Sequence, residues 1–392
     1  MKIVILHREY PPNTVFVSTS LLYQRMAKAF VNRGHEVHVI CQSSGRPIDR
    51  DDDGVYVHEI GSNLNRGSAR ARASYSYAAW RKLRHLSGID VVNAEFFLAE
   101  GLLYSLSKRD TPLVLQTHAW SEGWLDSTSV LGSAERRMSA YLEKVAARRA
   151  DKVIATSKAT YQWLLDKVGL PESHIRIVYE FVDTATYKPA KSDLRVRLGI
   201  PDDFRLVLFV ASLEPRKGPK ILADAIPQVL TQVPKTKFLF VGRDIDLAPG
   251  RTSMKSYIEQ VAEKGKFKNN IIFTGVLPIS DVVEAYSACD LFVYPGLIEA
   301  GGLPPLEAMA CDCPVIATAT GTSDELAGVS PAFQVVPPGD SKALAKKIIE
   351  LLSMQPQTLR QLAAKHRAIV EDRFNFDKMV NLLLSVYEEV MS

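Results

Sequence analysis

The chain has 392 residues, of which 46% are hydrophobic and 23% are charged. This composition is typical of a globular protein of about two to three domains, and it excludes a disordered, collagen-like or disulfide-scaffold protein. The 48 Lys and Arg against 44 Asp and Glu give a net charge of +4, too weak to indicate a nucleic-acid partner.

The first half of the chain predicts an α/β domain with a parallel sheet. Continuous apolar runs alternate with segments whose apolar residues recur at helical spacing, and a strand, helix, strand order is the start of such a sheet. The predicted strands are Ile3–Leu6, His35–Cys41, Val91–Ala94, Leu113–Thr117 and Val153–Thr156, and the predicted helices include Leu22–Phe30 and Ser133–Arg149.

A short polar stretch around Tyr187–Ser192 indicates a linker, and the same alternation begins again after it. Two similar α/β domains that face a cleft are therefore expected. The predicted strands are Leu206–Ala211, Phe238–Gly242, Ile271–Thr274, Leu291–Pro295 and Val315–Ala317; the predicted helices are Ile221–Val233, Asp281–Ala288 and Pro305–Ala310, and Leu359–Met391 is expected to be helical throughout.

The most informative segment is Glu299–Glu307, which follows a predicted strand and opens a predicted helix. Its two prolines are tolerated only in a first helical turn, where the free backbone amides also bind anions. Its two glycines let the backbone approach a ligand. Glu307, expected on that first turn, can accept hydrogen bonds from a ribose diol. Phosphate beside hydroxyls describes a nucleotide-sugar; the alternative is a tight turn with a carboxylate that only stabilises the helix.

A second cluster of charged residues follows the predicted strand that ends at Ala211. In Ser212–Gly218, Arg216 and Lys217 place two adjacent cations at the carboxyl end of a strand, where they would bridge a diphosphate. The alternative is a solvated pair of cations.

These segments resemble the signature of retaining glycosyltransferases of the GT-B fold, specifically family GT4. Glu299 and Glu307 are separated by seven residues, with Gly302-Leu303-Pro304 between them. Other matching segments are Ser212–Gly218 (the loop with the family's phosphate-binding Lys), Phe273–Val276 (its uracil-contacting turn), Ala288–Pro295, Thr117-His118 (its active-site His), Asp151–Ser157, and Ile177–Asp183 (its crossing into the second domain).

The resemblance implies two Rossmann-like, doubly wound domains: an acceptor-binding domain at residues 1–188 and a nucleotide-sugar-binding domain at residues 189–375. Residues 376–392 would form a helix that packs back on the first domain. The implied activity is the retaining transfer of a hexosyl group, with glucose the expected sugar, from a UDP-sugar to a glycan, lipid-linked or small-molecule acceptor. No metal ion or other cofactor is expected.

The resemblance also assigns roles to single residues. Lys217, helped by Arg216, would neutralise the leaving diphosphate, and Glu307 would hold the ribose. Glu299 would bind hydroxyls of the donor sugar, which His118 would contact from the first domain; the alternative for His118 is an ordinary polar residue. The remaining donor-binding residues are Gly242, Val276, Ala300, Gly301, Gly302 and Leu303, and Trp120 and Trp124 are candidates for stacking on a sugar ring.

Two segments depart from the family pattern. The family usually has an Arg five residues before Lys217, where this chain has Ser212, and Arg216 is a candidate to replace that charge. The family's Gly-Gly loop after the first strand is replaced by Asn13–Val17, in which Val15 and Phe16 are too bulky for a close backbone approach to the diphosphate.

Competing functions have weaker support. Asp51-Asp52-Asp53 contains an Asp-x-Asp pair, but it is expected in a loop without the sheet context of a manganese site. Asp244 and Asp246 are equally weak candidates for a metal site. The absence of Gly-x-Gly-x-x-Gly after any strand argues against a hydride-transfer enzyme. A GT-B-fold UDP-sugar epimerase and a UDP-sugar-binding protein without turnover are the alternatives.

The cysteine spacing and the short, interrupted apolar N-terminus indicate neither a zinc site nor a signal peptide, so a cytoplasmic setting is expected. The segment Arg66–Arg84 carries six basic and no acidic residues, interleaved with aromatic ones. Such a segment predicts peripheral contact with the anionic inner face of a membrane. The alternative is a solvated helix buried on its aromatic side.

Overall fold

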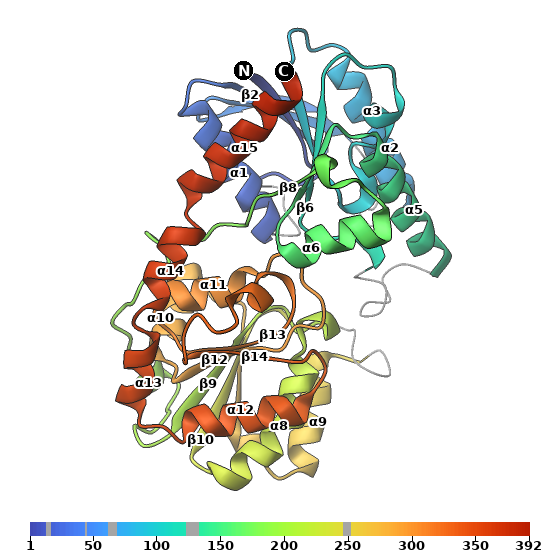
Figure 1. The fold of residues 1–392 in the computed structure, drawn as a ribbon. Coiled ribbons are helices and arrows are strands. Elements are labelled where there is room, and N and C mark those ends of the chain that lie inside the picture. The colour runs from blue at the N-terminus through green and yellow to red at the C-terminus, as the bar shows by residue number, and fades with distance from the viewer. Residues whose placement is uncertain (13–16, 44, 62–68, 123–132, 246–251) are drawn as a thin grey trace. The chain divides into compact units, whose positions relative to one another are not determined.

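The chain is described by a computed structural model covering residues 1–12, 17–43, 45–61, 69–122, 133–245 and 252–392. It divides into two compact units, each built on its own sheet (Figure 1). Within the described ranges, unit 1 contains residues up to Val178 together with Asp377–Ser392, and unit 2 contains Tyr179–Phe376. The predicted α/β class is confirmed.

Unit 1 contains an eight-stranded sheet in the order β3-β4-β2-β1-β5-β6-β7-β8. Every neighbouring pair is parallel except β3 and β4. The strands are β1 (Lys2–Leu6), β2 (Glu36–Ser43), β3 (Ile48–Asp52), β4 (Val55–Gly61), β5 (Val91–Glu95), β6 (Leu113–Thr117), β7 (Lys152–Ala155) and β8 (Ile175–Ile177). The helices are α1 (Val17–Val31), α2 (Ala69–Leu83), α3 (Leu102–Leu106), α5 (Ser133–Arg149), α6 (Lys158–Trp163) and α15 (Phe376–Met391).

The antiparallel hairpin β3–β4 differs from the prediction of a loop around Asp51–Asp53. Asp52 ends β3, and its carboxylate accepts hydrogen bonds from Tyr10 (3.0 Å) and Gln24 (2.8 Å) and pairs with Lys28 at 3.0 Å. Asp53 lies in the turn with a φ of 53°. Polar residues on an edge strand give no apolar pattern, which is why the strand was not predicted.

Helix α15 returns the end of the chain to unit 1. Tyr387 is fully buried there, its ring 5.8 Å from that of Phe30, and the Asn93 amide donates to its hydroxyl. Glu389 pairs with Lys152 at 2.8 Å. The C-terminal helix thus packs on the first sheet, as the sequence predicts.

Unit 2 contains a fully parallel six-stranded sheet in the order β11-β10-β9-β12-β13-β14. Its strands are β9 (Arg205–Val210), β10 (Thr236–Val241), β11 (Ile271–Gly275), β12 (Leu291–Tyr294), β13 (Val315–Thr318) and β14 (Phe333–Val336). Its helices are α7 (Leu194–Arg197), α8 (Pro219–Gln232), α9 (Met254–Lys264), α10 (Ile279–Ala288), α11 (Leu303–Ala310), α12 (Ser341–Leu352), α13 (Pro356–Ala363) and α14 (His366–Arg373).

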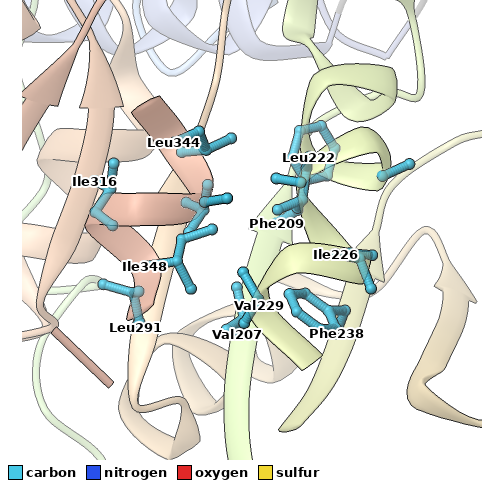
Figure 2. Close-up of a cluster of buried hydrophobic side chains, with 14 of the residues drawn as sticks. Val207, Phe209, Leu222, Ile226, Val229, Phe238, Leu291, Ile316, Leu344 and Ile348 are labelled. Carbon is cyan, nitrogen blue, oxygen red and sulfur yellow. The ribbon is translucent and has the colours of Figure 1, made fainter. Parts of the chain in front are cut away.

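The continuous apolar sequence of β9 follows from burial on both faces of this sheet. Val207 and Phe209 pack with α8 and α12 in one cluster, and Leu206 and Leu208 belong to a second cluster. Figure 2 shows the first cluster, with Leu222, Ile226 and Val229 of α8 and Leu344 and Ile348 of α12. The sheet of unit 2 is therefore covered by apolar packing on both faces.

The compact units divide between Val178 and Tyr179, earlier in the chain than the predicted boundary after residue 188. The residues in between contact unit 2: the Tyr179 hydroxyl donates to Glu325 at 2.6 Å, and the Val182 amide donates to the Phe374 carbonyl at 3.1 Å. These contacts attach the segment to unit 2 before the polar linker begins.

The prediction of an uninterrupted helical tail is wrong, because the tail consists of α13, α14 and α15. The first break follows Ala363 and the second surrounds Phe374, whose side chain is buried in unit 2. Val380, Leu383 and Tyr387 are buried on α15 as predicted, while Leu384 is half-buried.

Candidate functional site

The strand order of unit 2 reverses between β9 and β12, which are neighbours although β10 and β11 lie between them in the chain. In open parallel sheets ligands bind outside the carboxyl ends of the strands at such a switch point. The loop after β9 carries Arg216 and Lys217, and the loop after β12 carries Glu299. Three predicted site residues therefore follow the two strands that define the switch point.

The loop after β9 reaches the end of β12 through a 3-10 turn at Pro215–Lys217. Gly218 ends this turn with a φ of 75°. A Cβ at Gly218 would lie 1.9 Å from the carbonyl oxygen of Pro295, so only glycine allows the two loops to touch. The amide of Leu297 also donates to the carbonyl of Arg216 at 2.7 Å. Backbone contacts therefore fix the position from which the two cations extend.

Lys217 lies at the centre of a compact polar cluster. Its Nζ donates to Glu299 Oε1 at 2.7 Å and to the Tyr294 hydroxyl at 2.8 Å, and that hydroxyl donates to the same Glu299 oxygen at 2.8 Å. The Lys217 side chain is 16% exposed. The cation is thus held at the edge of the sheet rather than free in solvent.

Arg216 joins the same cluster and brings a further carboxylate into it. Its Nη1 lies 3.1 Å from Glu299 Oε1, and its Nη2 lies 3.0 Å from Glu214 Oε1. Ser212, which replaces the family's Arg, donates its hydroxyl to Glu214 at 3.2 Å. Arg216 therefore places a second cation beside Lys217, as the sequence predicts, and Glu214 and Ser212 support it.

Electrostatics keep the members of this cluster in defined protonation states. Burial alone would raise the pKa of Glu299, but Lys217 and Arg216 outweigh it and lower that pKa below its usual range. Burial and the neighbouring Arg216 lower the pKa of Lys217, which Glu299 opposes. Burial and then Glu299 raise the pKa of Tyr294 well above its usual value, so its phenol remains a hydrogen-bond donor.

The loop between Glu299 and α11 has a backbone that only glycine adopts easily. Gly302 is the N-cap of α11 with a φ of 103°, and prolines fill the start of the helix. The carbonyl of Gly301 accepts the Thr322 amide at 2.8 Å, and a Cβ at Gly321 would lie 2.3 Å from that carbonyl. Ala300 is buried and Leu303 is the first helical residue. The predicted glycine loop and helix start are therefore present, and their anion-binding role stays a prediction.

Glu307 lies in the second turn of α11, so its predicted position on the first turn is wrong. Because α11 begins at Leu303, two residues before Pro305, Glu307 lies four residues after the first helical residue, about one turn from the helix start. The Tyr286 hydroxyl donates to its carboxylate at 3.1 Å. The rings of Tyr286, Phe292 and Tyr294 follow one another at 5.2 and 6.2 Å, which links Glu307 to the Lys217 cluster through packed side chains.

Two further predicted donor residues lie at the ends of β10 and β11. Gly242 has a φ of 146°, and a Cβ there would lie 1.8 Å from the carbonyl oxygen of Ala211, so this glycine allows two strand ends to approach. Val276 follows β11 and is 72% exposed. The exposed side chain of Val276 is accessible to a nucleobase, but no contact within the protein assigns Val276 the predicted role in binding uracil.

In unit 1, His118 follows β6 and contacts Glu95, which ends β5. His118 Nδ1 lies 2.7 Å from Glu95 Oε2, and the Tyr23 hydroxyl donates to the same oxygen at 3.1 Å. The amide of Phe97 donates to Glu95 Oε1 at 3.1 Å. Burial alone would raise the pKa of Glu95. The charge of His118 and its hydrogen bond outweigh this effect, so the pKa of Glu95 lies below its usual value. The carboxylate therefore stays ionised and orients the imidazole.

The predicted stacking role of Trp120 is wrong. Its side chain is buried, and its ring stacks on Trp163 with centroids 4.7 Å apart, so it belongs to the interior of unit 1. Trp124 and the bulky pair Val15 and Phe16 lie outside the described residues, as does Asp246.

Sequence reasoning missed Glu95, Glu214 and Tyr294 as members of these clusters. Each lies at or just beyond the end of a buried strand, a position where polar side chains of parallel sheets gather. That signal was present in the sequence, but it does not say which neighbour each side chain contacts.

No group of three or more His, Cys, Asp or Glu side chains that could hold a metal ion occurs among the described residues. Asp244 accepts hydrogen bonds from the Ser253 hydroxyl and from the Lys255 amide at 3.0 Å. The predicted metal independence stays a prediction. In the described part of the chain, no helix is both long enough and apolar enough to cross a bilayer.

The basic segment forms α2 in part, and its side chains have mixed environments. Arg72 pairs with Glu135 at 2.8 Å and Lys82 with Asp49 at 3.0 Å, whereas Arg84 lies over the ring of Trp80 at 5.1 Å and Tyr77 is 52% exposed. Arg66 and the side chain of Arg70 lie outside the described part of the chain.

Comparisons with known proteins agree with this arrangement. Residues 190–368 match the family "Glycosyl transferases group 1", and residues 22–186 match "Glycosyltransferase Family 4". A sucrose-phosphate synthase from Thermosynechococcus elongatus superposes with a TM-score of 0.83 at 20% identity, covering 99% of this chain and 98% of that one. HepE from Anabaena, in complex with UDP and glucose, gives a TM-score of 0.76 at 22% identity, covering 99% and 100%.

The fold and the two family matches define a glycosyltransferase of the GT-B fold. The chain belongs to the GT4-type glycosyltransferases. Among relatives, it is 26% identical over 305 residues to a D-inositol 3-phosphate glycosyltransferase of Mycolicibacterium smegmatis, covering 77% of this chain and 68% of that protein. It is 23% identical over 372 residues to the N-acetyl-alpha-D-glucosaminyl L-malate synthase of Bacillus anthracis, covering 93% and 92%.

Proposed function

We propose that this glycosyltransferase moves a hexosyl group, with glucose the expected sugar, from a UDP-sugar to a hydroxyl acceptor with retention of anomeric configuration and without a metal ion. The observation that carries the proposal is the ion pair of Lys217 with Glu299 at the switch point, beside the start of α11. The complex of HepE with UDP and glucose supports UDP as the nucleotide.

The charges in the Lys217 cluster support an exchange of partners when the donor binds. Arg216 and Lys217 face Glu214 and Glu299, so the four side chains are neutral together. A diphosphate brings additional negative charge and would take over Lys217 and Arg216. Glu299, released from Lys217, would then accept hydrogen bonds from hydroxyls of the sugar.

The transfer step balances without a base from the protein. The bond between the anomeric carbon and the β-phosphate oxygen breaks, and its electrons leave with UDP. The acceptor oxygen bonds to the anomeric carbon from the same face, and its proton passes to the departing phosphate oxygen. Lys217, Arg216 and the amides of the α11 start would stabilise the charge that grows on that oxygen.

The test is incubation with a panel of UDP-sugars and candidate acceptors, followed by assay of free UDP and by NMR of the products. The proposal expects a glycoside with the donor's anomeric configuration, or slow UDP release when no acceptor is present. An isomerised nucleotide-sugar would favour the epimerase, and binding without either product would favour a UDP-sugar-binding protein. An inverted product would rule out the retaining mechanism.

Metal independence is tested in the same assay. Turnover with added EDTA should equal turnover with Mg²⁺ or Mn²⁺, because the cations of the Lys217 cluster supply the charge that a metal would otherwise supply. A rate that falls at least tenfold with EDTA and recovers with one metal would contradict this part of the proposal.

We further propose that the Arg66–Arg84 segment makes peripheral contact with an anionic membrane surface, which would suit a lipid-linked acceptor. The exposed side chains of Tyr77 and Arg81 on α2 support this contact, whereas Lys82 is paired with Asp49. At low salt the protein should sediment with anionic vesicles and not with zwitterionic ones. Equal partitioning into the supernatant with both would contradict it.

A further inference from the structure

Glu143 on α5 is a buried carboxylate that the proposed transfer step does not use. The residue is 1% exposed. Its Oε1 accepts the Leu98 amide at 2.8 Å, and its Oε2 accepts the Ser121 amide at 2.9 Å. The Ser121 hydroxyl also donates to Oε1, at 2.5 Å. Both carboxylate oxygens therefore hold backbone amides, and the two amides belong to different loops of unit 1.

These two loops follow β5 and β6 and are the ones that begin with Glu95 and His118. Leu98 lies three residues after Glu95, and Ser121 lies three residues after His118. Glu95 Oε2 and His118 Nδ1 are themselves 2.7 Å apart. One carboxylate on α5 therefore fixes both loops at the same number of residues beyond the two members of this pair.

The loop after β5 has an unfavourable backbone that the Glu143 contact supports. Leu98 and the next residue, Ala99, have φ values of 62° and 52°. A residue with a Cβ is strained in this left-handed region and stays there only where its surroundings hold it. The Leu98 amide, which donates to Glu143, belongs to the first of these two residues. The turn that follows Glu95 is thus held by an acceptor from outside its own loop.

A second contact joins the two loops but does not fix the same atoms. Phe96 and Trp120 both pack on the ring of Trp163, with centroids 5.8 and 4.7 Å from it. Apolar packing is largely non-directional, whereas a hydrogen bond requires its donor and acceptor to be aligned. Trp163 therefore keeps the loops together, and Glu143 sets the direction of their backbone amides.

We propose that Glu143 is a positioning residue for sugar transfer, which holds the loops after β5 and β6 and thereby fixes Glu95 and the orientation of the His118 imidazole. The inference rests on the proposed function, because the resemblance to GT4 enzymes is what gives His118 a contact with the transferred sugar. Glu143 itself touches no substrate. A shift of about 1 Å in a reacting group lowers a rate by up to about a hundredfold.

Glu143 is ionised under mildly alkaline conditions. Burial raises its pKa to about 7, although the hydrogen bonds from Ser121 and Leu98 oppose that rise. At about pH 8.5 the carboxylate is therefore charged and accepts all three hydrogen bonds. The kinetic comparisons below are made at this pH.

The first experiment compares kcat and donor KM of Glu143→Gln and Ser121→Ala with those of the unaltered protein. Glutamine keeps the shape of the side chain but has one accepting oxygen, so at least one hydrogen bond is lost. We expect kcat to fall about fivefold to tenfold and donor KM to change less than about twofold. Ser121→Ala keeps both amide hydrogen bonds and should lower kcat about twofold to threefold.

The matched control is Glu122→Gln in the same loop. Glu122 also contacts α5, through an ion pair with Lys144 at 2.7 Å, but its side chain is 36% exposed. This variant should leave kcat within about twofold of the unaltered value. Thermal unfolding shows whether each variant is folded at the assay temperature. If Glu143→Gln is folded and also keeps kcat within about twofold, the inference is overturned and the proposed function stands.

A double variant separates positioning from a general loss of structure. Glu95→Gln alone should lower kcat about tenfold, because it removes the carboxylate that orients His118. If Glu143 acts through the same imidazole, Glu143→Gln should cost less than about twofold in the Glu95→Gln background. Losses that multiply in the double variant would show that Glu143 acts independently of this pair and would overturn the inference.

The NMR spectrum of protein with labelled histidine rings gives a readout that needs no turnover. The His118 signal is identified by its loss in His118→Gln. It should shift or broaden in Glu143→Gln, while the signal of the exposed His85 should not change. An unchanged His118 signal would overturn the inference. If the unaltered protein makes no glycoside, the proposed function fails, and this spectrum still decides whether Glu143 positions the imidazole.

Discussion

The two units use the same position in the sheet for different chemistry. Each strand order reverses once, between β1 and β5 in unit 1 and between β9 and β12 in unit 2, and buried ionisable side chains follow both pairs of strands. In unit 2 two cations face two carboxylates around Lys217. In unit 1 Glu95 holds an imidazole and a phenol. The first arrangement suits a charged diphosphate, and the second suits a neutral, hydroxyl-bearing ligand.

The largest expected effect tests the charged side of this comparison. Lys217→Ala should lower kcat/KM by about a thousandfold, or about 4 kcal/mol, because it removes a cation beside the departing diphosphate. The measurement is steady-state kinetics with the preferred UDP-sugar, together with thermal unfolding. The matched control is Lys220→Ala, three residues beyond Lys217, which removes a more exposed lysine that pairs with Asp224. Unaltered activity in Lys217→Ala would contradict the assignment of the diphosphate pocket.

The next effect concerns His7 of unit 1, whose ring lies 4.3 Å from that of Tyr23. Burial lowers the pKa of His7 from 6.5 to about 4. Between these two pH values the folded protein therefore binds fewer protons than the unfolded chain. As pH falls from 6.5 to about 4, His7 should therefore remove about 3 kcal/mol from the free energy of unfolding.

The check is urea unfolding between pH 7 and pH 4 for the unaltered protein and for His7→Gln. The difference in the free energy of unfolding between the two proteins should change by about 3 kcal/mol between pH 6.5 and pH 4. Titrations of other groups cancel in this difference because both proteins share those groups. Parallel curves would show that His7 is not held neutral.

A smaller effect should follow from loosening the imidazole. Glu95→Gln removes the carboxylate that contacts His118 at 2.7 Å and fixes its orientation, so kcat should fall about tenfold. KM for the donor should change little, since Glu95 lies in unit 1 and the proposed diphosphate pocket in unit 2. A change confined to donor KM would contradict the separation of roles between the units.

The smallest effect tests the support of Arg216. Glu214→Gln weakens its contact with the guanidinium, now 3.0 Å, and should raise donor KM about fivefold. Lysine at position 216 should not compensate, because it cannot contact Glu214 and Glu299 with separate nitrogens. If Glu214→Gln leaves donor KM unchanged, Arg216 does not depend on Glu214 for its position.

The sequence predicted the elements whose signal is local. Buried strands such as Leu206–Ala211 were found because both faces of the sheet are covered, which leaves an unbroken apolar run. The β3–β4 hairpin was missed because its edge strand is mostly polar. The break between α14 and α15 was missed because Phe374 packs into the core of unit 2 at a position that no glycine or proline marks in the sequence.

Within the candidate site, residue types were predictable and their partners were not. Lys217 and Glu299 were found from their loops, yet their 2.7 Å contact depends on how two strand ends meet. Glu143 gave no signal at all, since its hydrogen bonds join one helix to two loops far from it in the chain. Such pairings are set by tertiary packing, which spacing along the sequence does not encode.

The return of α15 to unit 1 has a consequence for the order of folding during synthesis. The ribosome makes Phe30 and Asn93 long before Tyr387, the residue that covers them, and all of unit 2 is made in between. Unit 2 therefore has every one of its described strands and helices available while unit 1 still lacks its last helix. The first half of the polypeptide should be the last to reach its final packing.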